Sequence, residues 1–191
     1  MTAAPRDSVG VLIVGAGQAG SQVAVSLRDG GYTDRILIVG DEPHLPYQRP
    51  PLSKSFLMSD AQPDSLALRG EAAYARFSIE LIVDDTVETI DPGAKTAQLQ
   101  RGGTVTFDHV VLAVGGEPRR LTVPVIDLET DSPVDDNDTS GIHYLRAIAD
   151  AHRLRAAAQD ARNAVVVGGG FIGLEVASAL TTLGHSTTVL E

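Results

Sequence analysis

The stretch that decides the fold lies near the start of the chain, where residues 9–20 are VGVLIVGAGQAG. A short apolar run ends at a cluster of glycines, and an alanine-containing helical pattern follows. This order is typical of the strand, tight turn and helix that open a dinucleotide-binding βαβ unit. In such a unit Gly15 permits the tight turn, Gly17 lets a pyrophosphate approach the backbone, and Gly20 lets the helix pack closely on the strand. The start of the helix offers free N–H groups and a partial positive charge to the phosphates.

The residues that follow complete the first βαβ unit. The pattern predicts strands over 9–14 and 36–39, with a helix over 21–29 between them that stops at a pair of glycines. Asp41 follows the second strand, where a carboxylate can accept a hydrogen bond from a ribose hydroxyl.

The opening pattern occurs a second time near the end of the sequence, where residues 164–180 are AVVVGGGFIGLEVASAL. The two copies stay in register through the following helix, and the second strand of the second copy, 187–191, ends in Glu191. Two matched copies are far more specific than one, and they predict two dinucleotide sites. The usual pair of dinucleotides is FAD with a nicotinamide nucleotide, between which a hydride is transferred.

The residues between the copies divide into four patterns, the last of which is an acidic stretch. Short β runs over 80–83, 87–90, 96–100, 104–107 and 109–114 predict an antiparallel meander followed by a return strand, and 142–161 is predicted to be a helix. Four prolines in residues 43–51 exclude a regular helix or a central strand there. By composition this stretch is a rigid surface loop, and the alternative is a stiff wall beside a ligand.

An acidic stretch covers residues 127–140 and contains no Lys or Arg. A solvated loop is the main interpretation. A calcium loop is the alternative, but counting from Asp135 its sixth position is Ser140 instead of the expected glycine. We predict no metal site.

Bulk composition excludes several classes of protein. The formal net charge of −10 disfavours a nucleic-acid surface. The absence of cysteine excludes disulfides, Cys zinc sites, Cys-ligated iron–sulfur clusters and a redox-active Cys pair within these residues. No apolar run approaches the roughly 20 residues that span a bilayer, and no signal peptide is recognisable, so we expect a cytoplasmic protein.

With these motifs the sequence resembles the two-dinucleotide flavoprotein reductases, in particular the ferredoxin-reductase-like branch. This branch includes putidaredoxin and rubredoxin reductases, reductase components of aromatic-ring dioxygenases, and apoptosis-inducing factor. The most specific markers are residues 47–54, YQRPPLSK, and residues 166–175, VVGGGFIGLE. The resemblance extends over residues 9–191, nearly the whole chain.

The resemblance implies roles for residues at matching positions. Lys54 and Glu175 would form a pair near flavin N5, where a cation stabilises negative charge on the reduced ring, and an acid at Glu191 favours NADH over NADPH. The residues implied to bind FAD are Gly15, Gly17, Ala19, Gly20, Asp41, Arg49, Lys54, Val87 (through its backbone, to the adenine) and Arg146. Those implied to bind the nicotinamide nucleotide are Gly168, Gly170, Ile172, Gly173 and Glu191.

The expected fold class is α/β, with two Rossmann-like FAD/NAD(P)-binding domains that combine a parallel sheet and an antiparallel meander. We expect an incomplete FAD domain over 1–118, an acidic linker over 119–141, and the start of a truncated NAD domain over 142–191, because the family's chains are longer. The sequence is thus expected to be an N-terminal fragment of such a reductase.

The expected activity is hydride transfer from NADH to FAD, then single-electron transfer to a ferredoxin- or rubredoxin-type iron–sulfur protein, for instance in an oxygenase electron-transfer chain. Two alternatives stay open. One is another flavin-dependent NADH oxidase or hydroxylase, and the other is a non-catalytic FAD-binding fragment.

Overall fold

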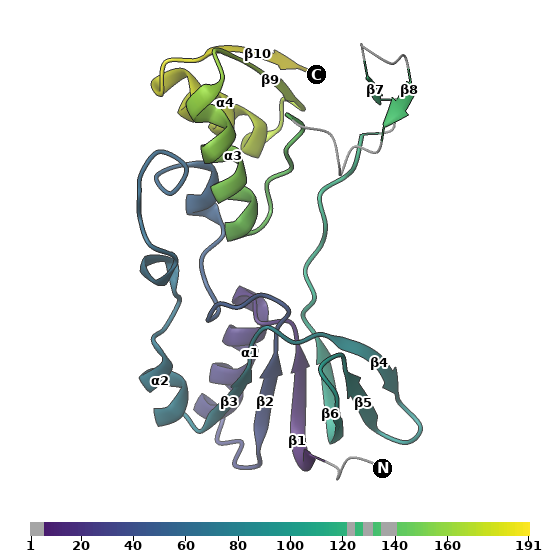
Figure 1. Cartoon of the computed structure of the whole chain (residues 1–191). Helices are drawn as coiled ribbons and strands as arrows, with labels where there is room; N and C mark the ends of the chain where they lie inside the picture. Colours follow the sequence, from purple (N-terminus) through teal and green to yellow (C-terminus); the bar gives the residue numbers. More distant parts are fainter. Residues whose placement is uncertain (1–5, 122–124, 128–131, 135–140) are drawn as a thin grey trace. The chain divides into compact units, whose positions relative to one another are not determined.

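The computed structural model describes residues 6–121, 125–127, 132–134 and 141–191 (Figure 1). The described residues form two compact units. The first comprises those up to Gln48 together with Gln62–Gly116, and the second comprises Arg49–Ala61 together with those from Glu117 to Glu191. Among the helices of the described residues, none has the length and apolar character needed to cross a membrane.

The first unit is built on a six-stranded sheet in the order β3-β2-β1-β6-β5-β4. Its four strands β3, β2, β1 and β6 are parallel, whereas β5 and β4 are added in antiparallel fashion. The strands are β1 (Arg6–Val14), β2 (Ile36–Val39), β3 (Ile79–Ile82), β4 (Val87–Asp91), β5 (Thr96–Leu99) and β6 (Thr104–Leu112). The helices are α1 (Gln18–Asp29), the 3₁₀ helix η2 (Pro63–Leu66) and α2 (Glu71–Arg76).

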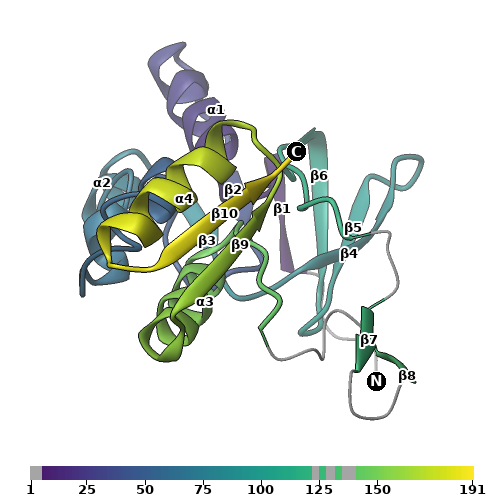
Figure 2. The same ribbon diagram turned by 90° about the horizontal axis from the view of Figure 1, so that it is seen from above.

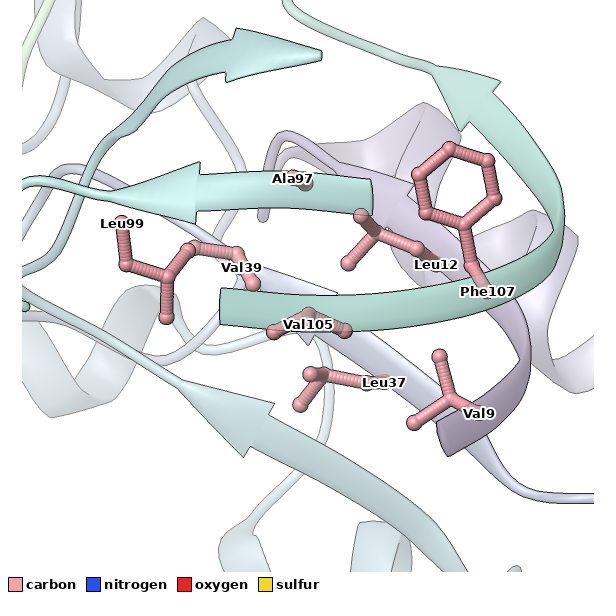
Figure 3. Packing of buried hydrophobic residues seen from close by; sticks show 8 residues of the cluster. All are labelled: Val9, Leu12, Leu37, Val39, Ala97, Leu99, Val105 and Phe107. Atoms are coloured by element: carbon pink, nitrogen blue, oxygen red, sulfur yellow. The ribbon is translucent and has the colours of Figure 1, made fainter. Parts of the chain in front are cut away.

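Alternating side chains of the central strands supply two hydrophobic clusters, one on each face of the sheet. On β1, Val11 and Ile13 join the cluster that α1 and α2 cover, which includes Ala24 and Tyr74. Leu12 lies in the opposite cluster, to which β1, β2, β5 and β6 all contribute apolar side chains (Figure 3). Every residue of β2 is buried, so this strand lies between the two hydrophobic clusters.

Two of the strand predictions are wrong in detail. The run predicted at 80–83 as part of the meander is β3, which pairs in parallel with β2 through Ile36 and Ile79. The runs predicted at 104–107 and 109–114 are one strand, β6, which pairs antiparallel to β5 and parallel to β1. The polar residue Asp108 lies between the two predicted runs and is exposed on an unbroken strand.

The second unit contains the second βαβ copy. Strands β9 (Asn163–Val167) and β10 (Ser186–Leu190) lie side by side in parallel, joined by α4 (Phe171–Thr182) (Figure 2). Helix α3 (Ile148–Asp160) and the 3₁₀ helix η1 (Pro50–Ser53) belong to the same unit. The core combines side chains from α3, β9, α4 and the segment that follows η1, namely Leu57, Ala158, Ala164, Val166, Val176, Ala179 and Leu180.

Helix α3 begins later than the sequence predicted. The expected helix spans 142–161, but the observed one begins at Ile148. The carboxylate of Asp150 accepts hydrogen bonds from the backbone N–H groups of Arg146 (2.8 Å) and Ala147 (2.7 Å). These bonds satisfy N–H groups just ahead of the helix and so fix its start.

The acidic stretch predicted as a loop contains an antiparallel pair of short strands, β7 (Val125–Asp127) and β8 (Ser132–Val134). Residues 128–131 and 135–140 lie outside the described residues, so the choice between a solvated loop and a calcium loop stays a prediction. The domain boundaries expected from the sequence also stay predictions, although the structure assigns Arg49–Ala61 to the second unit.

Candidate functional site

The two glycine loops have the same backbone geometry. Gly15 has a φ of +111° and Gly168 a φ of +107°, a conformation that side chains with a Cβ rarely adopt. Each N–H donates to the carbonyl of the last residue of the second strand in its own βαβ unit: Gly15 to Val39 at 2.8 Å and Gly168 to Leu190 at 2.7 Å. The register match found in the sequence therefore corresponds to a repeated turn.

The third glycine of each loop lies where the helix passes the turn. A Cβ on Gly20 would be 2.1 Å from the carbonyl oxygen of Gly15, and a Cβ on Gly173 would be 2.0 Å from that of Gly168. Both distances are far inside van der Waals contact with backbone atoms that have little freedom to move. The close helix packing expected at Gly20 is present, and the same packing occurs at Gly173.

The middle glycine of each loop is different, because a Cβ on Gly17 or Gly170 would meet no atom of the described residues within 4 Å. These two residues are the N-caps of α1 and α4, and within the part of the chain that the structure describes no side chain caps either helix. Neither first turn contains an acidic residue. At α1 the free N–H groups and the helix dipole therefore act without an acidic residue in the first turn, which is the arrangement that binds a phosphate. At α4 the Glu191 carboxylate lies against the N–H of Gly169, just ahead of the helix. Ala19 and Ile172 lie in these first turns.

Asp41 and Glu191, the acids expected to bind ribose hydroxyls, differ in their position after the second strand of their own βαβ units. Glu191 directly follows β10, and its carboxylate accepts a hydrogen bond from the Gly169 N–H. The equivalent place after β2 is Gly40, where a Cβ would be 2.3 Å from the Cβ of Ala16. A side chain is excluded there, and the first acid of this copy is therefore Asp41, which is exposed.

The segment before β4 brings Val87 to the edge of the first unit's sheet at which β2 ends. The N–H groups of Asp84 and Asp85 donate to the carbonyls of Glu42 (3.0 Å) and Gly40 (3.1 Å), just beyond the end of β2. The buried Asp85 carboxylate accepts from the N–H groups of Thr86 and Arg101. Sequence reasoning did not single out Asp85, because only the folded chain shows a carboxylate in this backbone turn.

In the second unit, Lys54 and Glu175 form the ion pair that the resemblance implied. Lys54 Nζ lies 2.7 Å from Glu175 Oε2, and it also lies 3.2 Å from the carbonyl oxygen of Pro50. Both side chains keep part of their surface in solvent, 48% for Lys54 and 32% for Glu175. The expected pairing of these two residues is confirmed.

The same carboxylate oxygen has a second donor, which the sequence analysis did not predict. Ser53 Oγ lies 2.6 Å from Glu175 Oε2. The hydrogen bond from Lys54, followed by the one from Ser53, lowers the pKa of the Glu175 carboxyl below its ordinary value. Glu175 is therefore ionised at neutral pH.

Arg49 and Arg146 are neighbours in the second unit. The Arg49 guanidinium donates to the backbone carbonyl of Arg146 at 2.8 Å. The N–H of Arg146 is held by Asp150 at the start of α3. The structure therefore brings together two cations that the resemblance associates with one cofactor.

The segment that carries Arg49, Ser53 and Lys54 is anchored to α3 by the residues that follow it. Phe56 and Leu57 are buried, and the Phe56 ring contacts the His152 ring edge to face at 5.3 Å. Arg155 donates to the carbonyls of Phe56 and Ser59. A proline-rich loop that composition alone assigns to the surface is thus tied to a helix.

Comparison with known proteins agrees with this geometry. A family described as pyridine nucleotide-disulphide oxidoreductase matches residues 9–191. The chain is 41% identical over 181 residues to rhodocoxin reductase of Rhodococcus erythropolis, covering 95% of this chain and 40% of that protein. It is 38% identical over 181 residues to a rubredoxin-NAD(+) reductase of Pseudomonas putida, covering 95% of this chain and 44% of that protein.

The fold is also similar to that of a solved protein, the ferredoxin reductase for the CYP199A2 system from Rhodopseudomonas palustris. The TM-score is 0.84 at 41% identity, and the match covers 96% of this chain and 42% of that one. The chain therefore spans about two fifths of the length of these three proteins. With a match over residues 9–191 and the paired glycine turns, the chain belongs to the pyridine nucleotide-disulphide oxidoreductase family.

Proposed function

We propose that the protein is an NADH-dependent flavoprotein reductase that passes electrons singly to a ferredoxin- or rubredoxin-type iron–sulfur protein. The observation that carries this proposal is the repeated glycine turn, together with the Lys54–Glu175 ion pair in the second unit. The three relatives are named as a rhodocoxin reductase, a rubredoxin-NAD(+) reductase and a ferredoxin reductase for the CYP199A2 system. Since the chain spans about two fifths of their length, the activity is proposed for the whole protein.

In this proposal the first glycine loop binds the pyrophosphate of FAD. Gly17 leaves open space in front of the uncapped start of α1, where the phosphates would receive backbone hydrogen bonds. Asp41 would accept hydrogen bonds from the ribose hydroxyls, and the backbone of Val87 would contact the adenine. Arg49 and Arg146 would balance negative charge on the same cofactor.

The second loop is proposed to bind the nicotinamide nucleotide. Gly170 has the same open space at the start of α4 as Gly17 has at α1. Glu191 would accept from a ribose 2′-hydroxyl and would repel a 2′-phosphate, so the proposal favours NADH over NADPH. Gly168, Gly173 and Ile172 would shape the turn and the first turn of the helix.

Lys54 and Glu175 are proposed to act on the flavin ring. When bound, FAD supplies the redox chemistry by accepting a hydride from NADH and releasing single electrons. The Lys54 ammonium would stabilise negative charge that develops at the ring on reduction. Glu175 would hold that ammonium in place. Without cysteine in these 191 residues, the chain contributes no thiol of its own to the reaction.

The partner is proposed to be a small iron–sulfur protein, for instance within an oxygenase system, and the proposed location is the cytoplasm. A flavin-dependent NADH oxidase is the competing activity. The hydroxylase alternative is less well supported, because the second glycine turn repeats the geometry of a dinucleotide site that a single-site hydroxylase does not need.

The experiment that tests the proposal measures electron transfer after FAD loading. The whole protein, for which the activity is proposed, is loaded with FAD and mixed with NADH or NADPH in the presence and absence of a ferredoxin. We expect reduction of the ferredoxin with NADH, at a higher kcat/KM than with NADPH. Oxygen consumption that is unchanged by ferredoxin would instead identify an oxidase, and retention of FAD without any oxidation of NADH would leave a non-catalytic FAD-binding chain.

A further inference from the structure

The Ser53 hydroxyl lies within hydrogen-bonding distance of two acceptors, and the nearer one is the Glu175 carboxylate. Ser53 is the last residue of η1 and only 4% of its surface is exposed. Its Oγ lies 2.6 Å from Glu175 Oε2 and 3.3 Å from the carbonyl oxygen of Pro50. Both neighbours accept hydrogen bonds, so the hydroxyl acts as the donor, and its single proton goes to the shorter contact. The result is a charge-assisted hydrogen bond to the carboxylate.

The ion pair alone does not fix the geometry of Glu175. Lys54 is about half exposed and Glu175 about one third exposed. Ion pairs between long, partly solvated side chains contribute little, because both chains lose rotamer freedom to form them. Ser53, by contrast, has a short side chain on a buried backbone that the preceding Pro50 and Pro51 restrict.

We propose that Ser53 is a positioning residue, whose hydroxyl directs the Oε2 atom of Glu175 toward the Lys54 ammonium. The inference rests on the proposed function in one respect only, namely that the Lys54–Glu175 pair acts on the flavin. Lys54 would then be held by a carboxylate whose orientation is set from a buried position rather than by solvent.

The test follows the titration of the Glu175 carboxyl by NMR, with ¹³C-labelled glutamate and assignment by Glu175→Gln. Ser53→Ala is expected to raise the titration midpoint, and the exposed neighbour Ser55→Ala, as the matched control, is expected to leave it unchanged. Equal midpoints in the Ser53→Ala protein and the unmutated protein would overturn the proposal.

A double-mutant cycle separates positioning from a simple local hydrogen bond. Lys54→Met is expected to raise the Glu175 midpoint more in the unmutated background than in the Ser53→Ala background, because a misdirected carboxylate interacts less with Lys54. If the two shifts are equal, Ser53 does not position the pair and the proposal fails.

Two controls complete the design. Methyl signals of Leu57 and Leu180 report whether the core of the second unit is intact. If Ser53→Ala loses them, the deuterium isotope shift on the Glu175 carboxyl is measured in the Lys54→Met protein, where the Ser53 hydroxyl is still present, and absence of a shift would overturn the proposal. None of these measurements uses flavin, so they succeed or fail independently of the proposed activity.

Discussion

At the residue scale, glycines of the same loop serve different purposes. Gly20 is required by the fold, because its missing Cβ makes room for the carbonyl of Gly15, whereas Gly17 faces open space. The sequence pattern contains both and does not say which glycine serves the fold and which serves a ligand. The distances around each residue separate the two.

Gly20→Ala and Gly17→Ala are therefore expected to differ in stability. A Cβ at 2.1 Å from a backbone oxygen forces the helix away from the turn, so Gly20→Ala should lower the free energy of unfolding of the first unit by about 2 kcal/mol or more. Gly17→Ala should leave it within about 0.5 kcal/mol of the unmutated value. Urea unfolding of both variants checks this, and equal losses would contradict the assignment.

The Glu175 carboxyl gives a pH dependence of known sign. Because its pKa is lowered in the folded protein, Glu175 stabilises the second unit fully at pH values above its ordinary pKa of 4.5. That contribution is lost as the pH falls through the folded pKa. The stability difference between the unmutated protein and Glu175→Gln should thus shrink below pH 4.5, and amide hydrogen exchange in α4, followed from neutral to acid pH, measures it.

At the scale of elements, strand type and approximate place were predictable, but partners and exact ends were not. β6 was expected as two strands, over 104–107 and 109–114, yet it is a single strand with the Asp108 side chain in solvent. β3 was placed in the meander, yet it pairs with β2. A local pattern reports exposure along a strand, and pairing depends on residues far away in the sequence.

The pairing of β3 leads to a prediction about the edge of the sheet. Arg35 forms a two-point ion pair with Glu80, with both N–O distances at 2.9 Å, and the Arg35 hydrogen bond lowers the pKa of Glu80. Glu80→Gln should destabilise the first unit at neutral pH by less than about 1 kcal/mol, since the pair is exposed. This loss of stability should vanish as the pH falls through the lowered pKa of Glu80. The exposed Glu88→Gln is the matched control in thermal unfolding.

The start of α3 gives a second prediction at this scale. The Asp150 carboxylate accepts hydrogen bonds from the N–H groups of Arg146 and Ala147. Asp150→Ala should therefore lower the free energy of unfolding of the second unit by about 1 kcal/mol. Asp150→Asn, which keeps one acceptor oxygen, should lose less. Hydrogen exchange at the first turn of α3 reports the effect, and an unchanged exchange rate in Asp150→Ala would show that the cap is not formed.

At the scale of the whole molecule, the sequence was sufficient for the fold class and for the paired turns. Gly15 and Gly168 have positive φ angles within a few degrees of each other, as their matching positions in the two copies suggested. The contribution of Ser53 was not predictable, because its acceptor lies 122 residues away in the sequence. Lys54 and Glu175 could be paired only through the family resemblance, for the same reason.

The central claim is that FAD binds at the first glycine loop and not at the second, and FAD titration of Gly17→Ala and Gly170→Ala tests it most directly. Both residues face open space, so both variants should fold normally. We predict that Gly17→Ala weakens FAD binding at least tenfold, because its Cβ occupies the pyrophosphate approach, and that Gly170→Ala leaves the FAD dissociation constant unchanged. An equal effect of the two variants, or a larger effect of Gly170→Ala, would contradict the account.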